Sequence, residues 1–365
     1  MLLFSSPKSP RSLDDLLGPS LIAKLDRLDL LSRKLLSGKL PGERRSKRRG
    51  RSVEFADFRQ YVPGDDLRHI DWNILGRLDK LFIKIFREEE DLSLHIILDA
   101  SASMDAGATS GTNITTPSNA AQSSNDSESK LTYAAKLGAA LAYLGLVNQN
   151  RVSMSAIGLA SRARPGLLRQ LAPLRGKANV RRLGAFVLEL LDDAQRREAL
   201  PGTQDPAQLA QQHAAALRTI GQTSAGRGIC VFISDLLVAS NMSTEAPNKG
   251  GETDLHSLSY LIGSSPGTYD TWCLQTLSPG ELDPTLLASS GLIGDLRLID
   301  IETNRGLEVT ISPASIAQYK ASLQRHLDIC KRACLSRGIA HALVRTDTPV
   351  EQLLLGTLRR GGLLR

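Results

Sequence analysis

Apolar positions along the chain follow two spacings, one typical of helices and one typical of buried strands. In residues 12–38, leucines recur every three or four positions, which predicts helix, broken near Gly18 and Pro19. Short continuous apolar runs predict strands covered on both faces, at 81–86, 94–98, 152–157, 229–233, 271–277 and 339–344. Helical spacing returns at 130–148, 180–191, 255–262 and 313–337, and a short final helix closes the chain. Because strands alternate with helices, we predict an α/β fold with a doubly wound, mainly parallel sheet.

Polar stretches interrupt this pattern. We predict flexible insertions where turn-forming residues replace large apolar side chains, at 105–129, 195–212 and 240–254. Residues 55–72 are polar and turn-rich. Residues 296–301 and 306–311 predict an antiparallel β-hairpin addition, with Thr303-Asn304 at its turn. The predicted domains are a helical segment with a basic arm (1–52), a segment ending in a lead-in strand (53–92) and the α/β domain (93–365).

Composition narrows the class of protein. The chain is 41% hydrophobic and 23% charged, which is typical of a soluble globular protein. No apolar run reaches the roughly 18–20 residues that cross a bilayer. Four cysteines without paired spacing favour a reducing compartment, and the N-terminus lacks the basic region of a secretion signal. We therefore expect a cytoplasmic protein.

The net charge of +7 is concentrated in one segment, residues 33–51, which we call the basic arm. It holds nine Lys or Arg against one acid, Glu43. This pattern fits a solvated linker, a contact for an acidic protein or anionic lipid, or a nucleic-acid contact. No aromatic residues are interleaved with the cations, so we expect no specific nucleic acid and at most peripheral membrane contact. The candidate partner-binding residues are Arg44, Arg45, Lys47, Arg48, Arg49 and Arg51.

The candidate site follows two predicted strands. Asp99 ends the strand 94–98, and the hydroxyls of Ser101 and Ser103 follow at alternate positions. Asp235 ends the strand 229–233 in the same way. Ligands bind outside the carboxyl ends of parallel strands, and hard cations prefer such oxygens, so we predict a Mg²⁺ or Mn²⁺ site here. The alternative is that Asp99 and the serines only cap the next helix.

Motifs for catalysis are missing from the sequence. There is no G-x-S-x-G elbow and no G-x-x-x-x-G-K-[ST] phosphate loop, so we predict no catalytic residues and no enzyme. A phosphatase-like use of an Asp99/Asp235 metal is a weaker hypothesis. His326, Cys330 and Cys334 lie at helical spacing, and because zinc usually takes four ligands we expect a packed helix face.

The strand-end residues resemble the metal-ion-dependent adhesion site of von Willebrand factor A domains. In those domains a strand-end D-x-S-x-S, a Thr from another loop and a later Asp hold a divalent ion, and Asp99, Ser101, Ser103 and Asp235 match the first and last elements. The middle Thr has no counterpart. The corresponding loop, 174–179, contains Lys177 instead, which could place a cation where the metal's partner should be.

Residues 54–73, EFADFRQYVPGDDLRHIDWN, resemble the signature segment of the bacterial domain-of-unknown-function family fifty-eight. The structural signature residues are Arg59, Tyr61, Pro63, Gly64, Asp65, Asp66, Arg68, Asp71 and Trp72. We interpret them as a network of paired acids and bases around a turn, with Trp72, Tyr61 and Phe58 as apolar anchors at a junction with the sheet. A general acid–base pair drawn from the same acids is the other interpretation.

The resemblance implies a function without catalysis. Family members look like adaptors that work with AAA+ ATPases of the MoxR type and with other von Willebrand factor A-like proteins, in assembling, activating or metal-loading other proteins. A bound metal would then present an open coordination position to a partner's carboxylate. The alternative is a metal-independent scaffold of the same fold that uses the basic arm to bind acidic proteins or membrane surfaces.

Overall fold

The computed structural model describes most of the chain, and the description below is restricted to that part. It covers residues 10, 12–28, 30, 53–63, 65, 67–88, 92–105, 128–158, 168–196, 206–223, 228–237, 255–262, 269–285, 294–299 and 306–364. The chain divides into two compact units, one formed by Met1–Lys34 with Leu92–Arg365 (unit 1) and one formed by Leu35–Asp91 (unit 2). The basic-arm residues Arg44 to Arg51 and the predicted insertion 240–254 lie outside the described residues, as does nearly all of 105–129.

Unit 1 is built on a six-stranded sheet with the order β10-β7-β6-β3-β4-β5. All neighbouring strands are parallel except β4 and β5, which pair antiparallel. The strands are β3 (Ser93–Asp99), β4 (Arg151–Ile157), β5 (Leu168–Arg175), β6 (Gly228–Ser234), β7 (Tyr269–Leu277) and β10 (Ala340–Arg345). The predicted α/β class with a mainly parallel sheet is confirmed.

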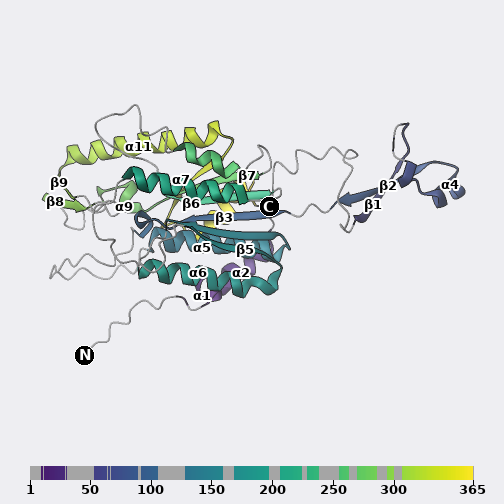
Figure 1. Ribbon diagram of the computed structural model, residues 1–365, viewed down its shortest axis with the longest axis horizontal. Coiled ribbons are helices and arrows are strands. Elements are labelled where there is room, and N and C mark those ends of the chain that lie inside the picture. The colour runs from purple at the N-terminus through teal and green to yellow at the C-terminus, as the bar shows by residue number, and fades with distance from the viewer. Residues whose placement is uncertain are drawn as a thin grey trace. The chain divides into compact units, whose positions relative to one another are not determined.

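Helices cover both faces of this sheet (Figure 1). On one face lie α1 (Leu13–Leu17), α2 (Pro19–Leu25), α5 (Lys130–Val147), α6 (Val180–Gln195) and the C-terminal turns Val350–Gln352, Leu353–Leu358 and Arg359–Gly361. On the other lie α7 (Pro206–Thr223), η4 (His256–Ile262) and α11 (Pro313–Ser336). Continuous apolar runs form the central strands because both of their faces are buried: every residue of β6 and β7 is buried.

The N-terminal helices belong to the core of unit 1. Leu25 is fully buried, Tyr143 of α5 donates a hydrogen bond to Asp26, and Leu30 pairs with Leu364 in an isolated bridge. The helix breaks at Gly18, where φ is +78°, and Pro19 starts α2, as predicted. The predicted grouping of these helices with the arm in a separate extension is therefore wrong, since their leucines complete the apolar face of α5 and α6.

Other boundaries also differ from the predictions. Helix α7 begins at Pro206, inside the segment predicted as an insertion from 195 to 212. The predicted hairpin is present as β8 (Gly294–Ile299) and β9 (Gly306–Ile311), with its first strand two residues earlier than expected and its turn outside the described residues. Helix α9 (Pro279–Leu282) precedes it. No helix in the described part of the chain combines the length and hydropathy needed to cross a membrane.

Unit 2 is a small antiparallel ribbon of β1 (Val53–Gln60) and β2 (Phe82–Glu88), joined by η1 (Leu67–His69) and α4 (Trp72–Leu78). The first part of the stretch 55–72, described from the sequence as polar and turn-rich, thus belongs to a strand. Asp65 bonds to Arg59 and to the Val62 N–H, and the latter bond lowers its pKa most, which confirms the predicted pairing of acids and bases at the turn. Gly64 and Asp66 lie outside the described residues.

Candidate functional site

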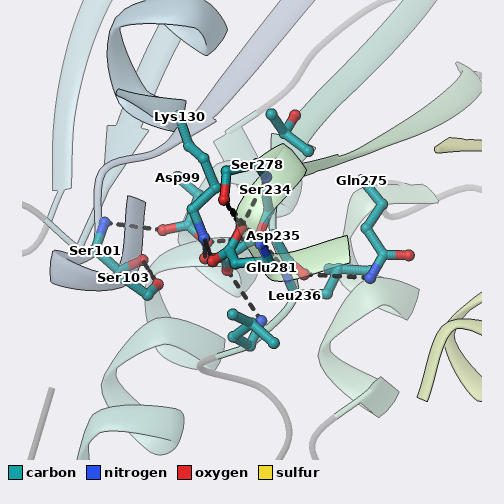
Figure 2. Close-up of polar contacts among 12 residues, drawn as sticks. Asp99, Ser101, Ser103, Lys130, Ser234, Asp235, Leu236, Gln275, Ser278 and Glu281 are labelled. Atoms are coloured by element: carbon teal, nitrogen blue, oxygen red, sulfur yellow. Dashed lines mark hydrogen bonds and ion pairs between the residues drawn. The ribbon is translucent and has the colours of Figure 1, made fainter. Parts of the chain in front are cut away.

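The strand-end rim, formed by residues 99–105 and 234–237, brings together the two carboxylates that the sequence singled out. β3 and β6 are adjacent and parallel, so Asp99 and Asp235 leave the sheet at the same edge. Both side chains are fully buried, and Figure 2 shows them side by side with Ser101 and Ser103. The four predicted site residues therefore converge, although they are far apart in the sequence.

Asp99 is held by protein donors on both of its oxygens. Oδ1 accepts the Ser101 N–H at 3.0 Å, and Oδ2 accepts the Ser234 hydroxyl at 2.5 Å. His213 of α7 places Nε2 3.5 Å from Oδ1. Burial raises the pKa of Asp99, but His213 and the hydrogen bonds from Ser234 and Ser101 outweigh it and bring the pKa to about 2. The carboxylate is ionised, and its Oδ1 accepts an N–H of its own loop.

The serines lie against a tight turn. Their hydroxyl oxygens are 3.1 Å apart, and the Met104 N–H closes a 3₁₀ turn, Ala102–Asp105, on the Ser101 carbonyl. Gly158, at the end of β4, has φ +83°, and a Cβ there would come within 2.8 Å of the Ser101 nitrogen. Only glycine allows these two loops to approach so closely.

The second loop is strained where it leaves β6. Leu236 has φ +60°, a conformation that costs a residue with a side chain about 1–2 kcal/mol. Its N–H donates to the Ser234 hydroxyl at 2.9 Å, and the Leu237 N–H donates to Asp235 Oδ1 at 3.0 Å. These bonds fix the direction in which both side chains point, and strain of this kind is typical of functional loops.

Lys130 is one of three residues at this site, with His213 and Glu281, that sequence reasoning missed. It is the first residue of α5, it is fully buried, and its Nζ lies 2.8 Å from Asp235 Oδ2 and 2.5 Å from Glu281 Oε1. Burial lowers the pKa of Lys130, but the two carboxylates outweigh burial and raise it above its usual value. Burial and the negative charge of Asp99 raise the pKa of Asp235, which favours its neutral form, whereas Lys130 lowers that pKa. We infer that Lys130 and Asp235 are both charged, because their 2.8 Å contact favours an ion pair.

Glu281 connects this network to α11, which covers the other face of the sheet. Its second oxygen, Oε2, accepts the Ser278 N–H at 2.7 Å and the Ser278 hydroxyl at 2.9 Å in a capping box. Its backbone carbonyl accepts the hydroxyl of Tyr319 from α11 at 2.9 Å. Lys130 and Tyr319 therefore hold α9 between α5 and α11.

The four predicted ligands together do not fit a divalent ion. Asp235 Oδ2 already accepts a hydrogen bond from the Lys130 ammonium at 2.8 Å, and the positive charge of this ammonium would repel a divalent ion bound to the same carboxylate. Asp99, Ser101 and Ser103 alone offer one carboxylate and two hydroxyls. No group of three or more His, Cys, Asp or Glu within the described ranges is placed to hold a metal. From the sequence, Lys177 was the lysine that could place a positive charge at this site. Its Nζ lies 3.8 Å from Asp26 Oδ2 instead, and the positive charge beside Asp235 is that of Lys130.

Two other predicted features have clear places. His326, Cys330 and Cys334 are buried on α11, which confirms a packed helix face, with Cys330 Sγ 3.5 Å from His326 Nε2. Trp72 and Phe58 were predicted to be apolar anchors, but they are 66% and 39% exposed. Trp72 belongs to α4, which has no buried residue, and Phe58 belongs to β1, so within unit 2 neither side chain is packed in a core. Their role as anchors at a junction with the sheet stays a prediction.

Comparison with known proteins gives a family but no activity. A family model described as "Protein of unknown function DUF58" matches residues 57–259. The uncharacterized proteins Rv1480 of Mycobacterium tuberculosis and Mb1516 of Mycobacterium bovis are each 23% identical over 338 residues, covering 91% of this chain and 87% of theirs. A crystal structure of the conserved hypothetical protein BatB from Bacteroides thetaiotaomicron matches with a TM-score of 0.30 and 14% identity, over 74% of this chain and 98% of that one.

Proposed function

Because this chain belongs to the DUF58 family, whose description assigns no activity, we propose from the site that it is a non-enzymatic adaptor binding a partner protein at the strand-end rim. The partner implied by the family resemblance is an AAA+ ATPase of the MoxR type, acting with other von Willebrand factor A-like proteins on the assembly or activation of further proteins. A fold of the von Willebrand factor A type is part of this proposal. The D-x-S-x-S turn at the carboxyl end of β3 supports it.

The observation that carries the proposal is the fixed charge network at the rim. Both oxygens of Asp99 and both oxygens of Asp235 accept hydrogen bonds from the chain itself. A hydrolytic centre needs a base or nucleophile that faces the substrate, whereas both carboxylates are fully buried and hold two loops and a helix in place. A surface that is already rigid loses less entropy when a partner binds, so the network favours recognition over chemistry.

In this proposal the rim needs no divalent ion. The Lys130 ammonium supplies the positive charge that balances Asp235 and Glu281, and it is covalently part of the chain. We therefore propose binding that persists in a chelator, in contrast to the metal-dependent association that the adhesion-site resemblance implies. The four buried cysteines, none of which forms a disulfide, support a cytoplasmic location.

The test is association with the MoxR-type ATPase of the same organism, measured by biolayer interferometry. Ala102 and Leu237 are partly exposed on the two rim loops. Ala102→Arg and Leu237→Arg should each weaken binding at least about tenfold, or about 1.4 kcal/mol. Leu335→Arg, at a position 57% exposed on α11, is the matched control and should bind like the wild type. Wild-type affinity in both rim variants would overturn the proposal.

The basic arm supports a second candidate, a scaffold that binds acidic proteins or membrane surfaces without the rim. Nine Lys or Arg against one acid within residues 33–51 favour it. If neutralising Arg44, Arg45, Arg48 and Arg49 abolished ATPase binding and flattened its salt dependence, while the rim variants bound normally, this candidate would replace the first.

A further inference from the structure

All four cysteines of the chain lie in one apolar cluster, on the face of the sheet that α7, η4 and α11 cover. Cys230 of β6 and Cys273 of β7 point to this face, whereas the neighbouring Trp272 points to the other. Cys330 and Cys334 face the sheet from α11, one helical turn apart. All four are buried, and none forms a disulfide. Every thiol of the chain is therefore gathered where a strand and a helix could be joined.

Cys273 and Cys334 are the two thiols that meet directly. They hydrogen-bond to each other where α11 packs on β7. Cys330 does not replace Cys273 in this pair, and its own Sγ lies 3.5 Å from His326 Nε2. Cβ atoms one turn apart on a helix are about 5–6 Å apart, whereas a disulfide needs roughly 3.5–4.5 Å. A bond between Cys330 and Cys334 would therefore distort α11.

Cys334 has the character of the thiol that reacts first. The hydrogen bond from Cys273 and the charge of Arg337 lower the pKa of Cys334, and burial opposes them. Arg337 is held in place because its Nε donates to the Ser259 hydroxyl at 3.1 Å. Cys273 shows the opposite shift, since its hydrogen bond to Cys334 and its burial both raise its pKa. The thiolate is the nucleophile in thiol chemistry, so Cys334 is the attacking group and Cys273 the second one.

The end of α11 gives a small oxidant a route to Cys334. This residue lies in the last turn of the helix, which ends at Ser336. Leu335, Ser336 and Gly338 around it are exposed. Terminal turns of helices open locally at a much smaller cost than the core of a domain. Brief opening of this turn is therefore enough to expose Cys334 while β7 stays in the sheet.

We propose that Cys273 and Cys334 are a peroxide-sensitive thiol pair that closes to a disulfide between β7 and α11. The Cys334 thiolate attacks one oxygen of hydrogen peroxide and displaces hydroxide, which leaves a sulfenic acid on Cys334. The Cys273 thiol then attacks this sulfur, and the hydroxyl group leaves as water. In sum, two thiols and one peroxide give one disulfide and two water molecules. Neither cysteine belongs to the strand-end rim, so the inference does not depend on the adaptor function.

The test exposes the reduced full-length chain to hydrogen peroxide under native conditions and then alkylates the remaining thiols in denaturant. Mass spectrometry should show that two of the four thiols are lost without added oxygen. Proteolytic digestion without reductant should release a peptide pair that joins Cys273 to Cys334. Dithiothreitol should restore all four thiols, because a disulfide is reversible whereas sulfinic and sulfonic acids are not reduced by a thiol.

Three variants assign the roles of the two cysteines. Cys273→Ala should prevent the disulfide and leave Cys334 as a sulfenic acid that dimedone labels. Cys334→Ala should leave Cys273 reduced, because the attacking thiolate is gone. Cys230→Ala is the matched control and should form the disulfide in wild-type yield. Cys230 is also buried, on the neighbouring strand, and burial raises its pKa to about 12.

Three results with the wild-type chain would overturn the inference. The first is four reduced thiols in the folded chain at a peroxide concentration that oxidises the urea-unfolded chain. The second is a disulfide that includes Cys230 or Cys330, or one that joins two chains. The third is sulfenic or sulfinic acid that accumulates without any disulfide. Each is read from the wild-type chain, so the decision does not require a variant to fold.

Discussion

At the scale of single residues, Lys130 supplies the buried positive charge that pairs with Asp235 and Glu281 at the rim. A lysine at the first position of a helix opposes the helix dipole, and complete burial of its ammonium adds a desolvation cost. Contacts with Asp235 and Glu281 offset both effects. The predicted helix 130–148 begins at this lysine, but nothing in the sequence relates it to Asp235 or Glu281.

Lys130→Met should destabilise unit 1 by about 3–5 kcal/mol, because it leaves two carboxylates without their buried cation. Lys320→Met is the matched control. Lys320 pairs with Asp283 at the same 2.8 Å, but the two side chains are 44% and 43% exposed, so the loss should be at most about 1 kcal/mol. Urea unfolding measures both changes. Equal losses in the two variants would contradict the role of Lys130.

His95 gives a prediction about pH. It is buried in β3, its Nε2 lies 3.1 Å from the Ser155 hydroxyl, and burial lowers its pKa from 6.5 to about 4. The folded chain keeps this imidazole neutral between these values, while the unfolded chain takes up a proton. Its stabilising contribution is therefore fully present above pH 6.5 and is lost as the pH falls towards 4, by up to about 3 kcal/mol.

The measurement is the free energy of unfolding of the wild type and of His95→Gln across this range. The variant should lose less stability than the wild type between pH 6.5 and 4, because its side chain does not titrate. The remaining slope belongs to other groups, including His326 and His341, whose pKa values burial also lowers. Identical slopes in the two proteins would show that His95 does not titrate as described.

At the scale of elements, packing depends on glycines where helices meet. Gly221 of α7 lies against η4, and a Cβ at this position would come within 2.2 Å of the Tyr260 carbonyl oxygen. Gly221→Ala should therefore destabilise unit 1 by about 1–3 kcal/mol. The control is Gly356→Ala, where the nearest atom is the end of the Arg360 side chain at 3.7 Å, and where stability should be kept or rise by up to about 1 kcal/mol. Thermal unfolding distinguishes the two, and a neutral Gly221→Ala would contradict this packing.

The elements that the sequence predicted well are those buried on both faces. β3, β6 and β7 contain apolar runs, and such runs indicate buried strands whatever the neighbouring strands are. β5 was missed because it is an edge strand with few buried residues, and its Pro173 falls where the register with β4 shifts. Such a strand is fixed by pairing with β4, which its own sequence does not reveal.

At the scale of the whole molecule, the sequence located one edge of the sheet but not how its charges are balanced. Asp99 and Asp235 could be placed together because parallel strands end at a common edge. Lys130, His213 and Glu281 reach that edge from α5, α7 and α9, and no spacing in the sequence connects them. Contacts of this kind depend on tertiary packing, so the choice between a bound metal ion and a lysine could not be made from the sequence.

In the proposed function a lysine of the chain, and not a divalent ion, balances the acids at the strand-end rim. The most direct measurement is calorimetric titration of Mn²⁺ into wild-type protein that has been stripped with a chelator. If Lys130 balances the acids, we expect no saturable binding tighter than about 1 mM, which corresponds to roughly −4 kcal/mol. Saturable binding of one ion per chain that Asp99→Asn removes would contradict it.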